Sequence, residues 1–214
     1  MLELVQTELF KEISQESIMK MMRCSKAIQK EYEAGQYIFR EEDKPEFLYL
    51  ILQGRVSVVK DFASGRQDIL YVASAGSVFG EDFFQSGQTR YWFDAIAEEP
   101  ATLLLLPWRF FFGFCSNACE HHQQINKNML EILSEKNSYM TKKAHILSST
   151  TLREKISVWL LENARDNEVE LPMNREQMAA YLGVTRPSLS RELMKMQKEN
   201  RILLEKNSIK ILNL

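Results

Sequence analysis

The chain has 214 residues, of which 45% are hydrophobic and 26% charged, and its formal net charge is −2 at pH 7. These values describe a globular protein of one large or two smaller domains, and they exclude a disordered or fibrous chain. The most apolar stretch, LLLLPWRFFFGF from Leu103, is interrupted by Pro107 and Arg109 and is far shorter than the roughly 20 residues that span a bilayer, so we expect no membrane anchor.

The N-terminus and the cysteines indicate the compartment. The opening MLELVQTELFKEISQES is acidic and amphipathic, and it lacks the basic start and small-residue cleavage site of a secretory signal. Cys24, Cys115 and Cys119 are an odd number of cysteines, so no disulfide framework is expected. We therefore expect a cytoplasmic protein.

Short β-like runs fill the chain from about Tyr32 to Trp108. Turn signals such as Ala34-Gly35 and Gln53-Gly54 separate them. Many short strands at this spacing predict a barrel or a sandwich. The runs are YIFR, FLYLIL, RVSVVK, DILYVA, WFDAIA and TLLLL.

A long helix is predicted from Cys115 to about Lys143, where neither glycine nor proline occurs. Its apolar residues form two adjacent stripes, which indicates two neighbours: the chain's own barrel and the same helix of a second subunit. A core helix inside a monomer is the alternative. The residues expected to carry the apolar contacts of this dimerisation helix are Ile125, Met129, Ile132 and Leu133.

A third piece follows the polar joint Ser148-Ser149-Thr150-Thr151. LREKISVWLLENA predicts an amphipathic helix, and VELPM a short extended stretch. Asn174 can cap a helix that ends at Gly183, and Thr185 can cap a second helix that tolerates Pro187 in its first turn. The runs RILLEK and SIKILNL predict a hairpin, which completes a winged helix-turn-helix.

The second helix of this motif has an unusual outer face. Leu189, Leu193 and Met196 share one buried stripe at helical spacing, so arginines and short hydroxyls point away from it. From Ser148 onward the chain has 11 Lys/Arg against 9 Asp/Glu, whereas the rest has 16 against 20. Such a basic face fits a DNA major groove, and an ordinary solvated helix face is the alternative.

These three pieces, in this order, resemble the Crp/Fnr superfamily of bacterial transcription regulators from about residue 18 to the C-terminus. The N-terminal half is similar to a cyclic-nucleotide-binding β-roll through GQYIF from Gly35, FLYLILQGRV from Phe47 and FGE from Phe79. The C-terminal half is similar through LREKI from Leu152 and LGVTRPSLSREL from Leu182.

The resemblance implies an α+β fold with a jelly-roll-like barrel, a long central dimerisation helix and a C-terminal winged helix-turn-helix. The expected domains are an effector-sensing domain over 1–114, the helix and hinge over 115–147, and a DNA-binding domain over 148–214. It further implies a homodimer that binds a palindromic DNA operator, with RNA polymerase as a partner and a small-molecule effector in the β-roll.

Carried over position by position, five residues of the second helix fall where the family reads bases. Arg191 matches an arginine that reads guanine. Pro187 replaces a glutamate found in well-known members, and its apolar ring suits a thymine methyl group better than a cytosine amine. The base-reading set is Arg186, Pro187, Ser188, Ser190 and Arg191, and Asn174, Arg175 and Thr185 match positions that hold the DNA backbone.

The resemblance also places an effector pocket at Gly80, Glu81, Arg90, Tyr91 and Trp92. Gly80-Glu81 and Arg90 fit the ends of a phosphate-binding cassette. Phe83 and Tyr91 stand where that cassette has small residues, which disfavours cyclic AMP, so Arg90 is expected to pair with Glu81 or to meet another anionic effector. Tyr91-Trp92-Phe93 either lines a ligand pocket or fills the barrel.

One helical face carries Cys115, Cys119 and His122, whose spacing suits a metal or haem ligand set or an oxidant sensor. Burial in the core or the dimer seam is the favoured alternative. The N-terminal cysteine cluster of iron-sulfur members is missing, since Cys24 stands alone, which argues against an iron-sulfur cofactor.

The function predicted is that of a sequence-specific transcription regulator. A small-molecule-binding module with vestigial DNA binding is the alternative. No nucleophile, base and orienting group occur in a familiar catalytic order, so an enzyme is not expected.

Overall fold

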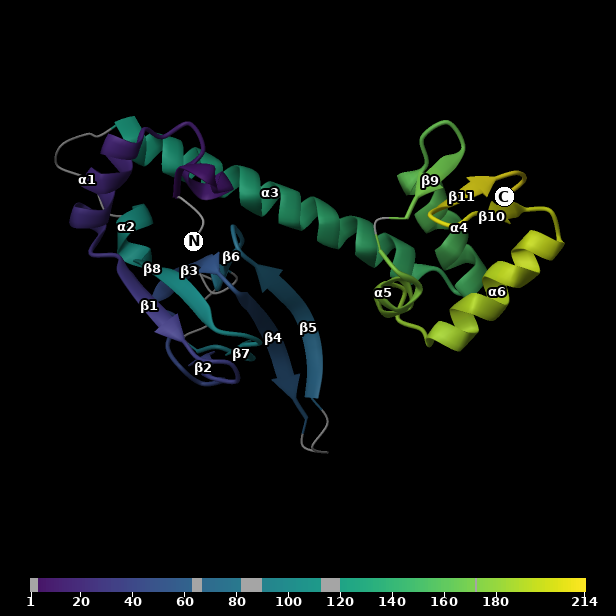
Figure 1. Cartoon of the computed structure of the whole chain (residues 1–214), viewed down its shortest axis with the longest axis horizontal. Coiled ribbons are helices and arrows are strands. Elements are labelled where there is room, and N and C mark those ends of the chain that lie inside the picture. The colour runs from purple at the N-terminus through teal and green to yellow at the C-terminus, as the bar shows by residue number, and fades with distance from the viewer. Residues whose placement is uncertain (1–3, 63–66, 82–89, 113–119, 172) are drawn as a thin grey trace. The chain divides into compact units, whose positions relative to one another are not determined.

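The computed structural model describes residues 4–62, 67–81, 90–112, 120–171 and 173–214. The chain divides into two compact units, Met1–Leu133 and Ser134–Leu214. Helix α3 (Glu120–Ser148) runs through the boundary between them (Figure 1). Among the described residues, no helix has the length and apolar character that crossing a bilayer requires.

The described part of the first unit is a β-roll of two antiparallel sheets with helical segments around it. The sheets have the strand orders β1-β8-β3-β6 and β2-β7-β4-β5. This confirms the predicted N-terminal β-roll. The elements are η1 (Leu4–Gln6), η2 (Glu8–Phe10), α1 (Gln15–Ser25), β1 (Ile28–Tyr32), β2 (Tyr37–Phe39), β3 (Phe47–Gln53), β4 (Arg55–Asp61), β5 (Gln67–Ser74), β6 (Val78–Phe79), β7 (Asp94–Ala97), β8 (Ala101–Pro107) and α2 (Trp108–Phe112).

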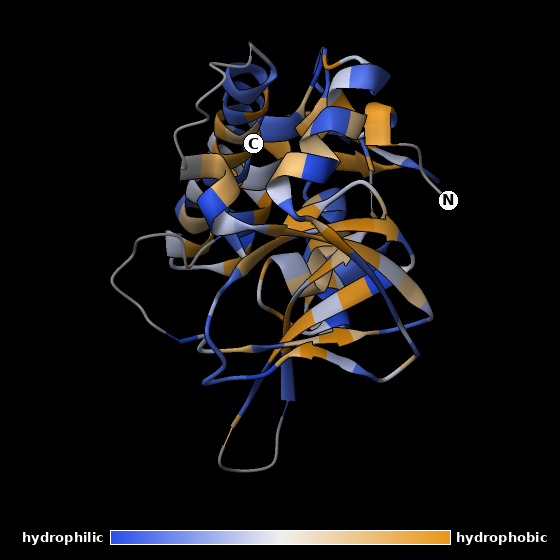
Figure 2. Cartoon of the chain, turned by 90° about the vertical axis from the view of Figure 1, so that its left-hand side faces the viewer, coloured by the Kyte–Doolittle hydropathy of each residue, from blue (hydrophilic) through white to orange (hydrophobic). Residues whose placement is uncertain are grey.

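Strands β3 and β8 are mostly apolar because both faces of their sheet are covered. Successive side chains of a strand point to opposite faces. Tyr49 and Ile51 of β3 therefore enter the core between the two sheets, and Leu48 and Leu50 enter a second core under the helices. Figure 2 shows hydrophobic residues along the strands of the roll and hydrophilic residues in many of its loops.

The N-terminal segment is fixed to the start of α3. Leu9 and Phe10 are fully buried in the core under the helices. The amide of Asn128, which is itself buried, donates hydrogen bonds to the carbonyls of Leu9 at 3.0 Å and Lys11 at 2.7 Å. These two hydrogen bonds satisfy backbone carbonyls of the N-terminal segment and attach it to the first unit.

The second unit is a winged helix-turn-helix that contains the C-terminal part of α3. Its further elements are α4 (Leu152–Asn163), β9 (Glu168–Glu170), α5 (Arg175–Tyr181), α6 (Arg186–Lys198), β10 (Ile202–Leu204) and β11 (Ser208–Ile211). The sheet has the order β10-β11-β9. Asp166 and Asn167 both have positive φ, as a tight hairpin turn requires, and they lead the chain into β9.

Candidate nucleic-acid interface

The turn between α5 and α6 depends on Gly183. Its φ is +67°, a left-handed conformation that side-chain-bearing residues rarely adopt. The amide of Gly183 donates to Ala180 O at 3.1 Å, and that of Val184 donates to Ala179 O at 2.9 Å. These two bonds satisfy the last carbonyls of α5 and turn the chain toward α6.

Asn174 and Arg175, two predicted backbone contacts, lie at the start of α5. The Asn174 side chain accepts from the amides of Glu176 at 3.0 Å and Gln177 at 2.9 Å, so its oxygen caps the helix. Arg175 is partly buried, its Nη1 lies 4.0 Å from the Met178 sulfur, and burial lowers its pKa. The side-chain oxygen of Asn174 therefore has a structural role.

Helix α6 begins at the cap predicted from the sequence. Thr185 Oγ1 accepts from the Ser188 amide at 3.4 Å, and Pro187 lies in the first turn, where its missing amide donor breaks no helical bond. The buried residues of α6 are the predicted stripe, Leu189, Leu193 and Met196. They pack with Ile156 and Leu160 of α4 in one core.

The outer face of α6 is basic and exposed. Arg186, Pro187 and Arg191 are exposed, and Ser188 and Ser190 are partly buried. Arg191 Nε donates to the Pro187 carbonyl at 3.3 Å, which lays the guanidinium along the helix. Ser190, Arg191, Met194, Lys195 and Lys198 line one surface groove. The structure thus brings the five predicted base-reading residues together at the N-terminal half of one helix.

Glu192 of α6 is bound by an arginine of α4. Arg153 of α4 donates from Nε to Glu192 Oε1 at 2.6 Å. Arg153 belongs to the LREKI motif, but the motif does not predict this contact. Its partner lies 39 residues further along the chain, and no local pattern connects the two.

The wing is the hairpin of β10 and β11. Leu204 pairs with Ile209, and the Glu205 amide donates to Ser208 O at 3.0 Å across the turn. Lys206 is exposed in that turn. No local pattern predicts that β9 pairs with β11, because this pairing joins segments about 40 residues apart in the chain.

The residues predicted to form the effector pocket lie in different surroundings. Arg90 contacts Glu42, which the sequence did not single out: its Nη1 donates to the Glu42 carbonyl at 2.7 Å, and its Nε lies 3.6 Å from the Glu42 carboxylate. Glu81 is buried. Gly80 has a φ of +85°, and a Cβ there would lie 3.0 Å from the Tyr49 ring. Phe83 lies outside the described residues.

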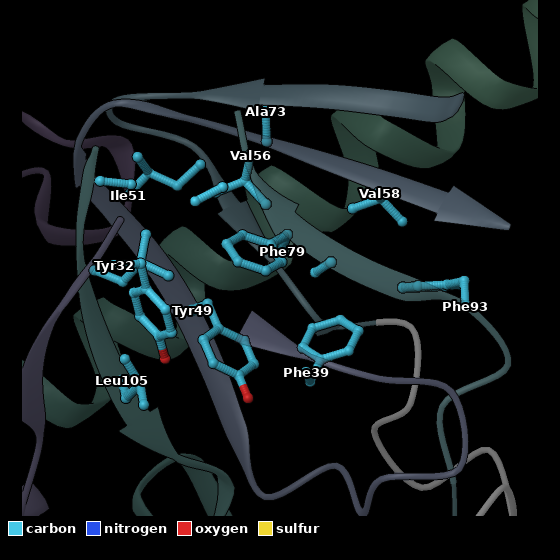
Figure 3. Packing of buried hydrophobic residues seen from close by; sticks show 14 of the residues in the cluster. Tyr32, Phe39, Tyr49, Ile51, Val56, Val58, Ala73, Phe79, Phe93 and Leu105 are labelled. Carbon is cyan, nitrogen blue, oxygen red and sulfur yellow. The ribbon is translucent and has the colours of Figure 1, made fainter. Parts of the chain in front are cut away.

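The three aromatic residues of the run Tyr91-Trp92-Phe93 also differ in their burial. Tyr91 is buried and stacks on Phe39 with a centroid distance of 3.7 Å, whereas Trp92 is 46% exposed. Tyr49 stacks on Phe79 at 4.9 Å, and Phe93 lies 5.9 Å from Phe39. Figure 3 shows Phe39, Tyr49 and Phe79 beside one another within this core. Tyr91 and Phe93 therefore fill the roll, and Trp92 points out of it.

The two apolar stripes of α3 also differ. Ile125 and Met129 are buried in the chain's own core, and Ile132 packs at its edge. In the second stripe Leu130 is 66% exposed, Leu133 37% and Met140 60%. Ile125 and Met129 are thus core residues, which corrects their assignment to the contacts of a dimerisation helix.

Cys115 and Cys119 lie outside the described residues. His122 packs against Phe110 with ring centroids 4.7 Å apart, and burial lowers its pKa. Within the described ranges, no three His, Cys, Asp or Glu side chains form a group suited to a metal ion.

Two family models match the chain in the order of its two units. The model described as a cyclic nucleotide-binding domain matches residues 29–118, and the one described as a Crp-like helix-turn-helix domain matches residues 154–214. The chain belongs to the Crp/Fnr superfamily of transcription regulators. Crp/Fnr regulators bind DNA through the helix-turn-helix and act as dimers.

Relatives of the Crp/Fnr superfamily match most of the chain. The nitrogen fixation regulation protein FixK of Bradyrhizobium diazoefficiens is 27% identical over 191 residues, 85% of this chain and 77% of FixK. CprK in complex with OCPA has a TM-score of 0.65 at 16% identity, covering 92% of this chain and 90% of that one. The c-di-GMP-responsive regulator CLP of Xanthomonas campestris has a TM-score of 0.59 at 16% identity, covering 94% and 100%. These two structures show that the fold is shared.

Proposed function

We propose that the chain is a homodimeric transcription regulator, not an enzyme, and that it binds a palindromic operator with α6 in the major groove. One observation carries this proposal: the leucines of α6 are buried in their own domain while Arg186 and Arg191 are exposed on its outer face. A helix with this division of side chains can present donors to base edges without exposing its core.

The roles of the α6 residues follow from their chemistry. Arg191 can donate two hydrogen bonds to guanine O6 and N7, and the ring of Pro187 suits a thymine methyl group. Ser188 and Ser190 are short, which permits close approach to the bases. Arg175 and Thr185 are assigned to the DNA backbone, where contacts provide affinity and register but no sequence choice.

The proposed dimer uses the exposed stripe of α3. Leu130, Leu133 and Met140 recur at steps of three and seven, as in a helix pair that meets along one seam. Two copies related by a two-fold axis would present two α6 helices. Their half-sites then lie about 10 base pairs apart, centre to centre, or a multiple of that spacing.

The roll is proposed as the regulatory part, with an effector other than cyclic AMP. Tyr91 occupies the place of a small cassette residue, and it is stacked on Phe39 in the core. CLP is described as c-di-GMP-responsive and CprK was solved with OCPA, so likeness in fold does not fix the effector.

Selection from a random duplex library tests the function. The wild-type protein is expected to enrich an inverted repeat and to bind it about 10³-fold or more tightly than a scrambled duplex at physiological salt. Equal binding to both duplexes would contradict the proposal and favour a small-molecule-binding module with vestigial DNA binding.

A further inference from the structure

Two glutamates stand out on the basic helix α6, one within it and one at its C-cap. Glu192 is the one acidic residue between Thr185 and Lys198, and it follows Arg191 directly. Glu199 is the C-cap of α6, where a negative charge opposes the helix dipole. A role outside the helix would explain both acids.

Both carboxylates bind the same guanidinium. Arg153 Nε donates to Glu192 Oε1 at 2.6 Å, and its Nη1 and Nη2 donate to the two carboxylate oxygens of Glu199 at 2.6 and 3.2 Å. The side chains of Arg153, Glu192 and Glu199 are 29%, 22% and 35% exposed, so the network is half-buried. The hydrogen bonds with Glu199 and then Glu192 raise the pKa of Arg153.

The arginine is held on a fixed support. It lies in the first turn of α4, where Thr151 and Glu154 form a capping box. Trp159 and Leu160 of the same helix are buried in the core that also holds Leu189 and Leu193. Helix α4 is therefore packed firmly in the core and gives Arg153 a rigid base from which to hold α6.

The two contacts are spaced along α6. Glu192 and Glu199 are seven residues apart, which is roughly 10 Å along a helix. Both contacts end at the one guanidinium of Arg153, so this side chain restrains α6 at two positions along its length. A lysine would supply a single ammonium group in place of the planar fork.

We propose that Arg153 is a positioning residue for DNA recognition, which holds α6 at two points so that Arg186 and Arg191 keep their orientation toward base edges. This inference rests on the proposed function of α6. The same contacts offset one of the two negative charges on a helix that approaches phosphates, and Arg201, whose Nε lies 3.4 Å from Glu199 Oε2, offsets the other. Orientation governs the choice between DNA sequences, whereas net charge governs affinity for every duplex.

Two variants separate orientation from charge. Arg153→Met removes one positive charge, and the double variant Glu192→Gln with Glu199→Gln removes two negative charges. Affinity for scrambled DNA should weaken in the first and strengthen in the second, because it follows net charge. The ratio of operator to scrambled binding should fall by about tenfold in both, since both break the network.

The experiment uses the full chain, a duplex that the wild-type protein selects from a random library, and a scrambled duplex at one salt concentration. Lys155→Met is the matched control, because it removes one positive charge from α4 two residues away from Arg153. The control should keep the wild-type ratio. Combining Arg153→Met with both glutamine substitutions should lower the ratio no further than Arg153→Met alone.

The outcomes are distinct. A lower melting temperature in Arg153→Met with an unchanged binding ratio would reduce Arg153 to a structural residue and overturn the inference. An equal fall of the ratio in Lys155→Met would overturn it as well. If Arg153→Met does not fold, the double glutamine variant decides in its place. If the wild-type protein enriches no sequence, the proposed function fails together with the inference.

Discussion

The β-roll buries Tyr91, one of the residues placed in its expected effector pocket, whereas the winged helix-turn-helix exposes the arginines expected to read DNA. Tyr91 stacks on Phe39 inside the roll. Arg186 and Arg191 lie on the outer face of α6. These residues, expected to bind a ligand or DNA, are thus buried in one unit and exposed in the other.

This difference shows when a hydrophobic pattern in the sequence is enough to predict which way a side chain points. Helix α6 has one apolar stripe and one core to pack against, so the burial of Leu189 and Leu193 leaves one direction for Arg191. Strands β3 and β8 of the roll contribute to a core on each face of their sheet, so apolar residues alone do not tell a pocket wall from a filled core.

The largest effect is expected at the exposed stripe of α3. Leu130→Glu places a charge in the proposed dimer seam, where burying it unpaired costs about 3–5 kcal/mol, and the variant should sediment as a monomer. Ser138→Glu adds the same charge at an exposed position off the stripe and should remain dimeric. Sedimentation velocity measures both, and an unchanged Leu130→Glu dimer would move the seam elsewhere.

The aromatic core of the roll should be next. Phe39→Ala removes the partner of Tyr91 and should destabilise the first unit by about 3–5 kcal/mol. Calorimetry should show a lower transition for the roll and an unchanged one for the winged helix-turn-helix. A loss below about 1 kcal/mol would mean that the roll is not tightly filled.

Substitutions at the proposed DNA interface should affect operator and scrambled DNA differently. Arg191→Ala should weaken operator binding by about 1–3 kcal/mol and relax the choice at one base pair, because a bidentate contact to guanine is lost. Arg175→Ala should weaken all duplexes more evenly. Titrations against operator and scrambled DNA measure both, and equal losses on the two duplexes for Arg191→Ala would contradict its role.

The buried tyrosines of the roll predict an alkaline limit to stability. Burial raises the pKa of Tyr49 and Tyr91 above the ordinary 10.0, so the fold favours their neutral hydroxyls. That contribution is complete below pH 10 and is lost as pH rises, at about 1.4 kcal/mol per pH unit for each tyrosine. Denaturant titrations should show Tyr91→Phe losing less stability than wild type above pH 10; parallel losses would count against it.

The smallest effect is expected at the turn of the DNA-binding unit. Gly183→Ala should cost about 1 kcal/mol of stability, because alanine is strained at a φ of +67°. No neighbour lies closer than 3.8 Å to the new methyl group, so the cost comes from the backbone. Thermal unfolding measures it, and a stabilised variant would show that the turn tolerates a side chain.

Local rules predicted much of the molecule. The caps Asn174 and Thr185, the stop at Gly183 and the buried stripe of α6 each depend on a few neighbouring residues, and the structure contains them. The runs predicted as strands became β2, β3, β4, β5, β7 and β8. Each of these features competes with few alternatives.

The rest depends on partners that are distant in the chain. Asn128 meets the backbone of Leu9 across 119 residues, and Arg153 meets Glu192 across 39. The two stripes of α3 were visible in the sequence, but the pattern does not say which one faces the roll. Arg90 pairs with Glu42 because a loop that is remote in sequence lies beside it.

The contact of Arg191 with guanine tests the central claim most directly. The half-site guanine of the selected operator is replaced by 7-deazaguanine, which lacks the N7 acceptor, and the binding of wild type and Arg191→Ala is measured on both duplexes. The account predicts about a tenfold loss of affinity for wild type and almost none for Arg191→Ala, because the variant has already lost the donor. An equal loss in both proteins would show that Arg191 does not read that base.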